Sequence, residues 1–502
     1  MEIQMQKRLI KKISQYIDAG FPILYINSFE DDKIDSMIEE LGMGKEILEW
    51  NGAKGLVDFK TKNPQLTISN SLATVLDLFL SKDEIERKIM VLKDIHSCIS
   101  EPEVIAKLKI IVNLINQGTD ATIIIISSVL VIPPELEKYI TILEMDYLSV
   151  EEIKALVRTF MEENQLPMIK DELLNEFAVS FKGLSEFEIC NLLALAYSDD
   201  GELTRKDLGL IFEQKQQTIK KAGILDMIPL KESMDDIGGL DNLKIWLKKK
   251  AKVFQNIQAA EAFGVDMPKG VLIAGIPGCG KSLSAKAIAH LFDVPLLRLD
   301  MGRLMGKYVG ESEANMRRAV ALAEAISPCV LWIDELEKAF AGIGSNGGSA
   351  EVTTRLFGYF LTWLQEKSSP TFVVATANDI TKLPPELMRK GRFDEIFYIG
   401  LPTSEERKCI FEIHIKKRRP SDLKKINIGL LTGRTDGFSG ADIEGVVKEA
   451  VESAFSENRK EVTTADLVNA IDETNTLMGT MGDSLKTLMD EYKKRKYKNA
   501  AR

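Results

Sequence analysis

Short apolar runs alternate along this chain with longer amphipathic stretches. In the second half, three of the runs are continuous enough to be buried strands, at residues 270–274, 329–333 and 372–377. Strands that are covered on both faces read as unbroken apolar runs, whereas half-buried strands alternate polar with apolar positions. A helix-compatible stretch, residues 283–291, follows the first run after a short polar segment. The pattern predicts an α/β architecture for this half of the chain.

The segment between the first strand and its helix reads Gly-Ile-Pro-Gly-Cys-Gly-Lys-Ser at residues 275–282. Glycines let backbone N–H groups converge on phosphate oxygens, and the helix N-terminus adds a partial positive charge. Lys281 would reach the β- and γ-phosphates, and the Ser282 hydroxyl would ligate Mg²⁺. A plain glycine turn requires neither the Lys-Ser pair nor the second glycine. We therefore expect a nucleoside triphosphate to bind at Pro277, Gly278, Cys279, Gly280, Lys281, Ser282 and Leu283.

Two acidic residues, Asp334 and Glu335, follow the second apolar run. Asp334 would hold Mg²⁺ through water, and Glu335 would orient and polarise the attacking water. Phosphoryl transfer requires positioning and charge neutralisation more than covalent chemistry, so no nucleophilic side chain is needed. Paired acids at the end of a strand are also common turn residues. The phosphate loop upstream favours the catalytic interpretation.

Further segments indicate which kind of nucleotide hydrolase this is. Asn378 ends the third strand, where it could contact the γ-phosphate or the attacking water, and Arg389 and Arg392 lie three residues apart in a turn. Met-Asp-Asp-Ile-Gly-Gly-Leu at residues 234–240 precedes the phosphate loop, and Asp-Gly-Phe-Ser-Gly-Ala-Asp-Ile at residues 436–443 opens a later helix. Together with the phosphate loop and the acidic pair, these motifs resemble the AAA family of ATPases.

The resemblance, which covers about residues 232–472, implies a P-loop NTPase fold, a three-layer αβα sandwich with a small helical lid. It implies that Asn378 is the first sensor and that Arg389 and Arg392 act in trans on the nucleotide of a neighbouring subunit. ATP with Mg²⁺ would bind between the subunits of a homo-oligomeric ring, which we expect to be a hexamer. The residues that fall where the family surrounds adenine and ribose are Ile237, Gly239, His414, Gly440 and Ala441.

The resemblance also supplies an interpretation for Tyr308, within Lys-Tyr-Val-Gly-Glu-Ser-Glu at residues 307–313. In members that remodel proteins, an aromatic residue followed by an apolar residue and glycine lines the central pore and grips a translocating polypeptide. The alternative is an ordinary loop before a helix that Ser312 caps. A second pore-facing loop would be the glycine-rich segment 342–349. Residues 364–367, Leu-Gln-Glu-Lys, depart from the Asp-Gly-Phe intersubunit signal of the family, which leaves the coupling between subunits open.

A second copy of this architecture, without its chemistry, is predicted in the first 200 residues. The apolar runs at residues 23–26, 89–94 and 123–128 would be its phosphate-loop, acidic and sensor strands. Gly-Leu-Ser-Glu-Phe-Glu-Ile at residues 183–189 mirrors residues 437–443, at a similar distance from a Pro-Pro pair. Similarity in order and spacing indicates a duplication. An unrelated α/β domain with similar periodicity is the alternative.

The segment in place of the first phosphate loop, Asn-Ser-Phe-Glu-Asp-Asp-Lys-Ile at residues 27–34, contains no glycine. Its backbone cannot fold around phosphates, and the carboxylates of Glu30, Asp31 and Asp32 would repel them. We therefore expect that this half does not bind ATP. A degenerate ATPase half is physically suited to serve as a platform for docking or assembly.

The two-part organisation resembles one narrower group, the ATPases named for hypothetical chloroplast reading frame 46, which occur in plastid genomes, cyanobacteria and other bacteria. Lys-Asp-Ile-His at residues 93–96 and the segments 361–367 and 375–379 carry this likeness, which covers nearly the whole chain. The likeness narrows the architecture more than the role. We divide the chain into 1–198 (degenerate ATPase-like α/β domain with a helical lid), 199–231 (linker helix), 232–402 (large αβα subdomain), 403–475 (helical lid subdomain) and 476–502 (charged C-terminal tail).

Composition fits a large enzyme of a reducing compartment. The 502 residues include five scattered cysteines and three histidines, which indicate neither a disulfide framework nor a zinc site. The net charge of -10 argues against binding of nucleic acid through the overall charge of the protein. The longest apolar stretch, around residues 123–132, is broken by two serines and is too short to span a bilayer. We expect a soluble cytoplasmic protein without membrane insertion, or a stromal one if the chain is plastid-encoded.

We therefore predict an ATPase, converting ATP and water to ADP and phosphate, that remodels or regulates a protein client. A nucleic-acid motor or loader is a second class, but it would require basic pore residues where this chain has Tyr308 and Val309. A nucleotide-gated scaffold with slow turnover is a third class, which the degenerate first half permits.

Overall fold

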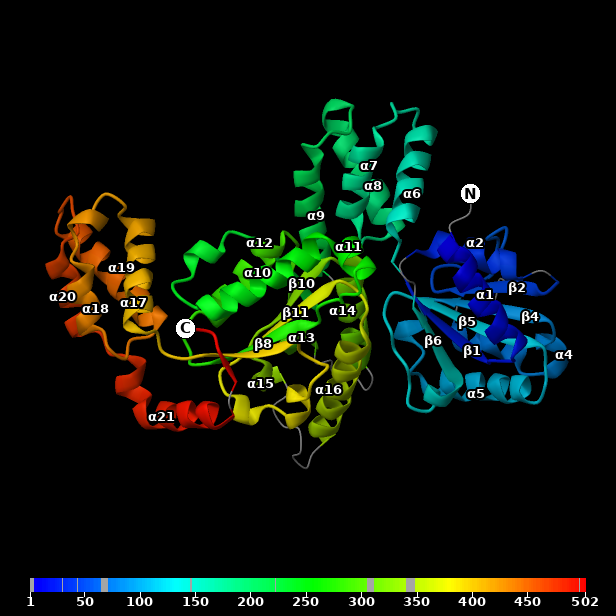
Figure 1. Ribbon diagram of the computed structural model, residues 1–502. Helices are drawn as coiled ribbons and strands as arrows, with labels where there is room; N and C mark the ends of the chain where they lie inside the picture. The colour runs from blue at the N-terminus through cyan, green and yellow to red at the C-terminus, as the bar shows by residue number, and fades with distance from the viewer. Residues whose placement is uncertain are drawn as a thin grey trace. The chain divides into compact units, whose positions relative to one another are not determined.

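The structure is a computed structural model of the chain (Figure 1), and it describes residues 4–28, 30–42, 44–64, 71–144, 147–221, 223–304, 311–339, 348–495 and 497–502. The chain forms two compact units, Met1–Leu208 (unit 1) and Gly209–Arg502 (unit 2). The predicted pore residue Tyr308 lies outside the described residues, as do residues 342–347 of the second predicted pore loop. No helix in the described part of the chain is long and apolar enough to cross a membrane.

Unit 1 contains a sheet with the strand order β3-β2-β4-β5-β1-β6, in which neighbours are parallel except for the antiparallel pair β2 and β3. The strands are β1 (Ile23–Asn27), β2 (Glu46–Asn51), β3 (Gly55–Asp58), β4 (Lys88–Lys93), β5 (Ala121–Ser127) and β6 (Ile140–Glu144). The helices along the sheet are α1 (Gln4–Asp18), α2 (Asp31–Leu41), α3 (Leu72–Leu76), α4 (Lys82–Ile85) and α5 (Pro102–Asn116). The helices that follow β6 are α6 (Val150–Glu163), α7 (Asp171–Phe181) and α8 (Glu186–Asp200).

The central strands of unit 1 are apolar on both faces because helices cover both. In β1, Ile23 and Tyr25 belong to a buried cluster with α3 and α5, whereas Leu24 and Ile26 belong to one with α1 and α2. Alternate side chains of a strand point to opposite faces of the sheet. The two clusters are therefore the two sides of a three-layer αβα sandwich.

Unit 2 contains a sheet with the strand order β13-β12-β8-β11-β10-β9-β7, in which neighbours are parallel except for β7 and β9. The strands are β7 (Leu225–Ile228), β8 (Gly270–Gly275), β9 (Leu296–Leu299), β10 (Cys329–Ile333), β11 (Thr371–Ala377), β12 (Glu395–Ile399) and β13 (Lys498–Asn499). The helices outside the lid are α9 (Asp207–Lys221), α10 (Asp241–Gln255), α11 (Ile257–Ala262), α12 (Lys281–Phe292), α13 (Met301–Leu304), α14 (Glu311–Ile326), α15 (Leu336–Ala339), α16 (Gly348–Glu366) and α21 (Leu477–Arg495).

Helices also cover both faces of the second sheet. On one face, the rings of Phe254 in α10, Phe292 in α12 and Phe372 in β11 pack together, with centroids 4.9 to 5.7 Å apart. On the other face, α14 contacts β10 and α16 (Figure 1). Residues 199–231, predicted as a linker helix, contain α9 but also β7, which forms an edge of this sheet.

The two sheets share their central strand order. The order β6-β1-β5-β4-β2 in unit 1 corresponds to β12-β8-β11-β10-β9 in unit 2, and all of these neighbours are parallel. The correspondence pairs β1, β4 and β5 with β8, β10 and β11, as expected for a duplicated architecture. The edges differ, because β3 extends the first sheet whereas β7 and β13 extend the second.

A helical lid follows β12, shown in orange in Figure 1. Its helices are α17 (Ser404–Arg418), α18 (Ile428–Arg434), α19 (Gly440–Ser456) and α20 (Thr464–Glu473). Ser439 caps α19, preceded by Gly437 at a φ of +79°. In unit 1, Ser185 caps α8 in the same way, preceded by Gly183 at a φ of +81°. The paired motifs recognised in the sequence therefore form equivalent helix starts.

Candidate active site

The phosphate loop connects the buried strand β8 to α12 and touches the lid. Gly278 and Gly280 have φ angles of +73° and +90°, which residues with a Cβ rarely adopt. A Cβ on Gly278 would lie 3.0 Å from both Ser439 Oγ and the Cβ of Ala441. The Ala441 N–H donates a 2.9 Å hydrogen bond to the Gly278 carbonyl. Glycine therefore allows the loop to pass close to the first turn of α19.

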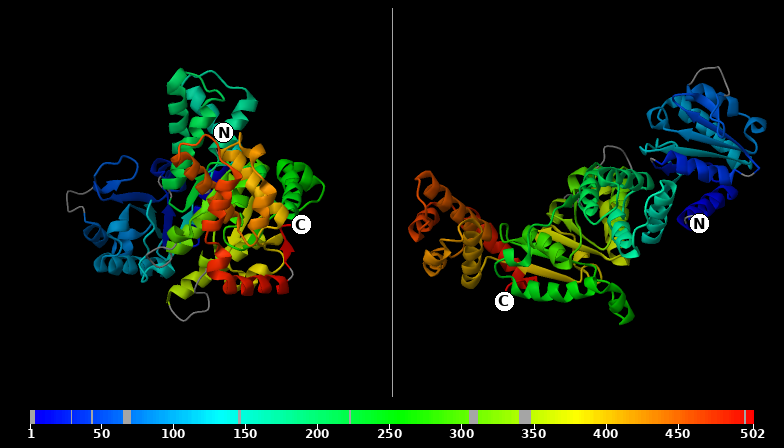
Figure 2. Two further views of the ribbon diagram at one scale, coloured as in Figure 1. Left: turned by 90° about the vertical axis from the view of Figure 1, so that its left-hand side faces the viewer. Right: turned by 90° about the horizontal axis from the view of Figure 1, so that it is seen from above.

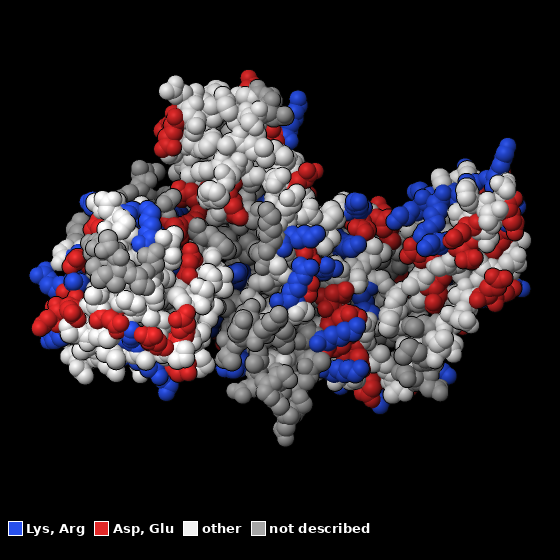
Figure 3. Space-filling model, turned by 180° about the vertical axis from the view of Figure 1, so that it is seen from behind, with Lys and Arg blue, Asp and Glu red and all other residues white. Residues whose placement is uncertain are grey.

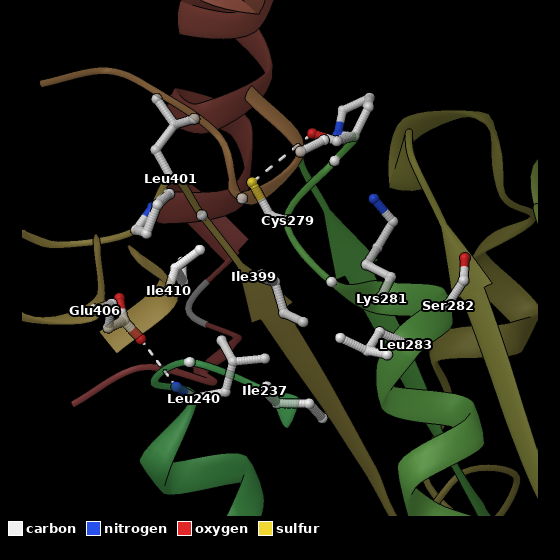
Figure 4. A pocket seen from close by; sticks show the side chains of 18 of the residues that line it. Ile237, Leu240, Cys279, Lys281, Ser282, Leu283, Ile399, Leu401, Glu406 and Ile410 are labelled. Atoms are coloured by element: carbon white, nitrogen blue, oxygen red, sulfur yellow. Dashed lines mark hydrogen bonds between the residues drawn. The ribbon is translucent and has the colours of Figure 1, made fainter. Parts of the chain in front are cut away.

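Lys281 is the first residue of α12, and its side chain is buried. The ammonium group donates to the carbonyl oxygens of Gly275 (2.9 Å) and Ile276 (2.8 Å). Burial lowers the pKa of Lys281 to about 8, because the acidic groups nearby offset only part of the lost hydration. Figure 4 shows this side chain pointing from the start of α12 toward the loop. A phosphate bound here would supply the negative charge that the buried ammonium lacks.

Ser282 and Asp334 form the candidate metal position. The Ser282 hydroxyl donates to Asp334 Oδ1 over 3.3 Å, and the Thr376 hydroxyl donates to the same oxygen over 2.5 Å. Hydroxyl and carboxylate oxygens are ligands that Mg²⁺ prefers. Among the described residues, no group of three or more His, Cys, Asp or Glu side chains could hold a metal. The hydroxyl of Ser282 and the carboxylate of Asp334 are therefore compatible with Mg²⁺ as a ligand pair.

Glu335 follows Asp334 at the end of β10 in a left-handed conformation, with a φ of +50°. Its N–H donates to Thr376 Oγ1 over 3.1 Å. Asn378 Nδ2 donates to Glu335 Oε1 over 3.1 Å, and the Asn378 N–H donates to Glu337 Oε1 over 3.0 Å. The ends of β10 and β11 thus hold together a carboxylate that can accept a proton from water and an amide that can orient the water.

These groups line one cavity of about 650 Å³, a size typical of small-molecule sites. The lid and the segment 234–240 line one end of the cavity, where the predicted residues Ile237, His414, Gly440 and Ala441 all lie. Apolar side chains such as Leu240 and Ile410 line this end together with the acids Asp236, Glu406 and Glu444. Burial lowers the pKa of His414, which favours the neutral form of its imidazole. A flat base would find apolar contacts at this end, and phosphates would find Lys281 at the other.

Gly239 does not line this cavity, unlike the other predicted binding residues. Its φ is +75°, and a Cβ there would lie 2.2 Å from Glu406 Oε1. The Leu240 N–H donates to the same Glu406 oxygen over 2.9 Å (Figure 4). Gly239 therefore lets the segment approach the lid helix α17, and its neighbours Gly238 and Leu240 line the cavity instead.

Arg389 and Arg392 do not line the cavity of their own chain. The Arg389 side chain is exposed, and it makes no ion pair or hydrogen bond with the described residues. The Arg392 guanidinium donates to the Glu386 carbonyl of the same turn. An arginine that serves a neighbouring subunit must be exposed in a single chain, and Arg389 meets this requirement. Its action in trans stays a prediction.

Several lining residues were not among those predicted from the sequence. Thr376 contacts both acids, and its place two residues before Asn378 on β11 is a signal that could have identified it. Met489, Asn499 and Ala501 reach the cavity from the C-terminal segment. Asn499 is placed by the pairing of β13 with β12, about a hundred residues away in the sequence, and Met489 by the helix α21, so no local pattern marks either residue as lining the cavity.

The corresponding position in unit 1 carries the opposite charge. Asp94 follows β4 with a φ of +52°, as Glu335 follows β10 with a φ of +50°. This correspondence places Lys93 where unit 2 has Asp334. Lys93 Nζ lies 2.8 Å from Asp35 Oδ2 and 3.7 Å from Glu49 Oε2. An ammonium held by carboxylates thus replaces the carboxylate that would hold a metal.

A carboxylate of unit 1 also meets its own lid helix. Glu30 Oε1 accepts hydrogen bonds from the N–H groups of Glu186 (2.9 Å) and Phe187 (3.4 Å) at the start of α8. Lys33 Nζ lies 3.0 Å from Glu186 Oε2. Helix N-termini favour negative charge, so this contact is stabilising. Negative charge is already present where phosphates would approach, and we still expect no ATP binding in unit 1.

Comparison with known proteins gives the family. The family described as "ATPase family associated with various cellular activities (AAA)" matches residues 271–401, and the AAA+ lid domain matches residues 425–469. The N-terminal domain of SpoVK-like AAA ATPases matches residues 9–145, and the second domain of the same proteins matches residues 151–222.

Relatives match nearly the whole chain. The AAA domain-containing protein ycf46 of Guillardia theta is 40% identical over 487 residues, which cover 96% of this chain and 94% of that protein. The chain belongs to the AAA ATPase family. The ycf46 protein of Pyropia yezoensis is 38% identical over 91% of this chain and 92% of its own length. The proteasome-activating nucleotidase of Saccharolobus solfataricus is 32% identical over 58% of this chain and 77% of its own length.

These matches confirm the predicted family and the predicted fold. The AAA domain contains β8 to β12, and the lid domain contains most of α18 to α20. The narrower likeness to the ycf46 type is confirmed as well, because the relatives cover both units.

Proposed function

We propose that unit 2 of this AAA protein hydrolyses ATP to ADP and phosphate. The observation that carries the proposal is the convergence of Lys281, Ser282, Asp334, Glu335 and Asn378 on one cavity. These residues come from the carboxyl ends of adjacent parallel strands, where α/β sheets bind their ligands. Positioning and charge neutralisation are what phosphoryl transfer requires of a protein.

Each group has a distinct task in this proposal. Lys281 exchanges its two loop carbonyls for phosphate oxygens, and the N–H groups of the loop bind the remaining oxygens. Ser282 would ligate Mg²⁺ and Asp334 would hold it through water, and the bound ion would neutralise charge on the phosphates. Glu335 accepts a proton from water. Its 3.1 Å hydrogen bond from Asn378 Nδ2 keeps the carboxylate and the amide close together, so that both can contact the same water.

Two substitutions separate binding from turnover. Lys281→Ala removes the cation that meets the phosphates, so it should abolish Mg-ATP binding. Glu335→Gln keeps the shape of the site but cannot take the proton, so it should retain binding and lose turnover. Calorimetric titration measures the binding, and Glu366→Gln, an exposed acid at the end of α16, is the matched control. Equal loss of binding in the Lys281 and Glu335 variants would contradict this division of tasks.

We further propose that the chain works as a ring, expected to be hexameric, on a protein client. The exposed Arg389 and its separation from the cavity of its own chain support a site shared between subunits. A relative at 32% identity is named as a proteasome-activating nucleotidase, which supports a protein as the client.

A nucleic-acid client would favour a broad basic face. On the face drawn in Figure 3, basic and acidic side chains of the described residues are interspersed on each unit. Capture with Glu335→Gln in the presence of ATP distinguishes the classes. Bound protein would support the remodelling proposal, bound nucleic acid would favour a motor or loader, and ring assembly without any client would favour a scaffold.

A further inference from the structure

The C-terminal segment of unit 2 extends the sheet beside the nucleotide cavity. β13 pairs in parallel with β12, so that Tyr398 lies opposite Asn499. The Ala500 N–H donates to the Tyr398 carbonyl (2.9 Å), and the Ala500 carbonyl accepts from the Asn242 N–H of α10 (3.0 Å). Ala500 is fully buried. The end of the chain is therefore fixed to the sheet on one side and to a helix start on the other (Figures 1 and 2).

This segment also forms part of the cavity wall. Met489 of α21, Asn499 of β13 and Ala501 line the same cavity as Lys281 and Asn378. A ligand in the cavity would therefore contact the last residues of the chain directly. Nothing in the charged helix or in the two-residue strand marks these residues as ligand contacts in the sequence.

Tyr492 of α21 connects the segment to Asn378. Its ring is buried and stacks on Tyr398, with centroids 4.4 Å apart and planes inclined by 27°. Its hydroxyl donates to the Asn378 carbonyl (3.4 Å) and accepts from the Ile380 N–H (3.3 Å). Burial raises the pKa of Tyr492, so the hydroxyl keeps its proton to donate. One hydroxyl thus holds the backbone on both sides of Asp379.

The backbone at Asn378 fixes where its side chain lies. The Asn378 amide donates to Glu335, the proposed base. A rotation of this backbone would move the amide away from the carboxylate and from any water between them. The segment also reaches the arginine turn, because the Tyr497 hydroxyl lies 2.9 Å from the sulfur of Met388, the residue before Arg389.

We infer that Tyr492 is a positioning residue of the ATP site, acting on Asn378 through its backbone, and that the segment 498–502 forms part of the wall of the nucleotide cavity through Asn499 and Ala501. The role of Tyr492 rests on the proposed hydrolysis. The wall requires only that nucleotide binds.

Tyr492→Phe tests the first part because it keeps the stacked ring and removes the hydroxyl. One lost hydrogen bond that acts on the transition state corresponds to a fall in kcat of roughly fivefold to tenfold. The dissociation constant for Mg-ATP should stay within about twofold, since Tyr492 does not line the cavity. Tyr16→Phe in α1 is the matched control for the same chemical change. An unchanged kcat, or a parallel loss of affinity and thermal stability, would overturn the role.

A double variant identifies the route of the effect. In an Asn378→Ala background, Tyr492→Phe should lower single-turnover phosphate release no further, because the side chain that it positions is absent. Two effects that multiply would show that Tyr492 acts elsewhere, and would overturn the assignment.

Truncation after Tyr497 tests the wall. Removal of residues 498–502 should weaken Mg-ATP binding by roughly tenfold, as loss of a contact surface of the ligand. Thermal unfolding without nucleotide shows whether the truncated chain remains folded. Asn499→Ala, which removes one side chain and keeps the segment, should also weaken Mg-ATP binding. Wild-type affinity in both variants would overturn the inference that this segment lines the nucleotide cavity.

The inference and the proposed function fail differently. A wild-type chain that binds Mg-ATP but releases no phosphate would contradict hydrolysis, and with it the kinetic role of Tyr492. An active wild type with an equally active Tyr492→Phe variant would contradict the inference alone.

Discussion

The affinity of unit 2 for Mg-ATP is predicted to fall as the pH rises from 7 to 9. Burial lowers the pKa of Lys281 to about 8 in the free protein. Bound phosphates add negative charge beside the ammonium, so the pKa of Lys281 must rise in the complex. Binding therefore takes up a proton wherever the free lysine is neutral. The affinity is nearly full at pH 7, is about half lost at pH 8 and continues to fall as the pH rises further.

The size of the effect follows from the same pKa. If only the ammonium form binds phosphate, the competent fraction is about nine tenths at pH 7 and about one tenth at pH 9. The dissociation constant should then increase about tenfold, which corresponds to ~1.4 kcal/mol. At pH 8, about half a proton should be taken up for each nucleotide bound.

The shifts of three other groups that line the cavity move their titration away from the range between pH 7 and pH 9. Burial lowers the pKa of His414, raises that of Cys279 to about 11 and raises that of Tyr398 to about 12. Lys367 also has a pKa lowered by burial to about 8, but it bonds to the Thr371 carbonyl and does not line the cavity. Lys367→Gln is therefore the matched control, and it should leave the pH dependence of binding unchanged.

Calorimetry on the Glu335→Gln variant, which should not consume the nucleotide, measures both quantities. Titrations in buffers of different ionisation enthalpy give the proton uptake together with the dissociation constant. An affinity that is constant from pH 7 to pH 9 without proton uptake would refute the reasoning. If the pH dependence of binding disappears in Lys367→Gln, it arises from Lys367 and not from Lys281.

Nucleotide counting tests unit 1: the Glu335→Gln chain should bind one Mg-ATP, and a second equivalent would contradict the degenerate site. Gly278→Ala should weaken binding at least tenfold in a titration, because its Cβ would lie 3.0 Å from Ser439 Oγ, whereas Gly358→Ala has open space on α16 and should bind normally. Arg389→Ala chains should regain turnover when mixed with Glu335→Gln chains, since an arginine supplied in trans is worth roughly 10³–10⁵ in rate. Mixed rings without activity at every ratio would contradict the action in trans.

The candidate residues of the site could be identified from the sequence because each belongs to a local pattern, and their roles in catalysis stay predictions. Lys281, Asp334 and Asn378 each follow an apolar run, and parallel strands bring their carboxyl ends to one edge of a sheet. A local pattern does not show which residue of a motif faces the cavity, as Gly239 illustrates. Its motif was recognisable, but the position of Glu406 on a distant lid helix decides which residue of the segment faces the cavity.

The parts that could not be predicted depend on distant pairing. β13 has two residues and therefore no periodicity, and its position is fixed by β12 and by the Asn242 N–H. Similarly, the absence of glycine in residues 27–34 predicted the loss of a phosphate loop, but not the placement of Lys93 between Asp35 and Glu49. Side chains far apart in the sequence form that cluster, and only the fold brings them together.

The proposal that unit 2 hydrolyses ATP is tested by phosphate release from Mg-ATP by the assembled wild-type chain. The wild type should release phosphate continuously, and Glu335→Gln should release none although it holds one uncleaved ATP in the cavity of unit 2. A wild-type chain that binds Mg-ATP and releases no phosphate, or a Glu335→Gln chain that releases it at the wild-type rate, would contradict the account.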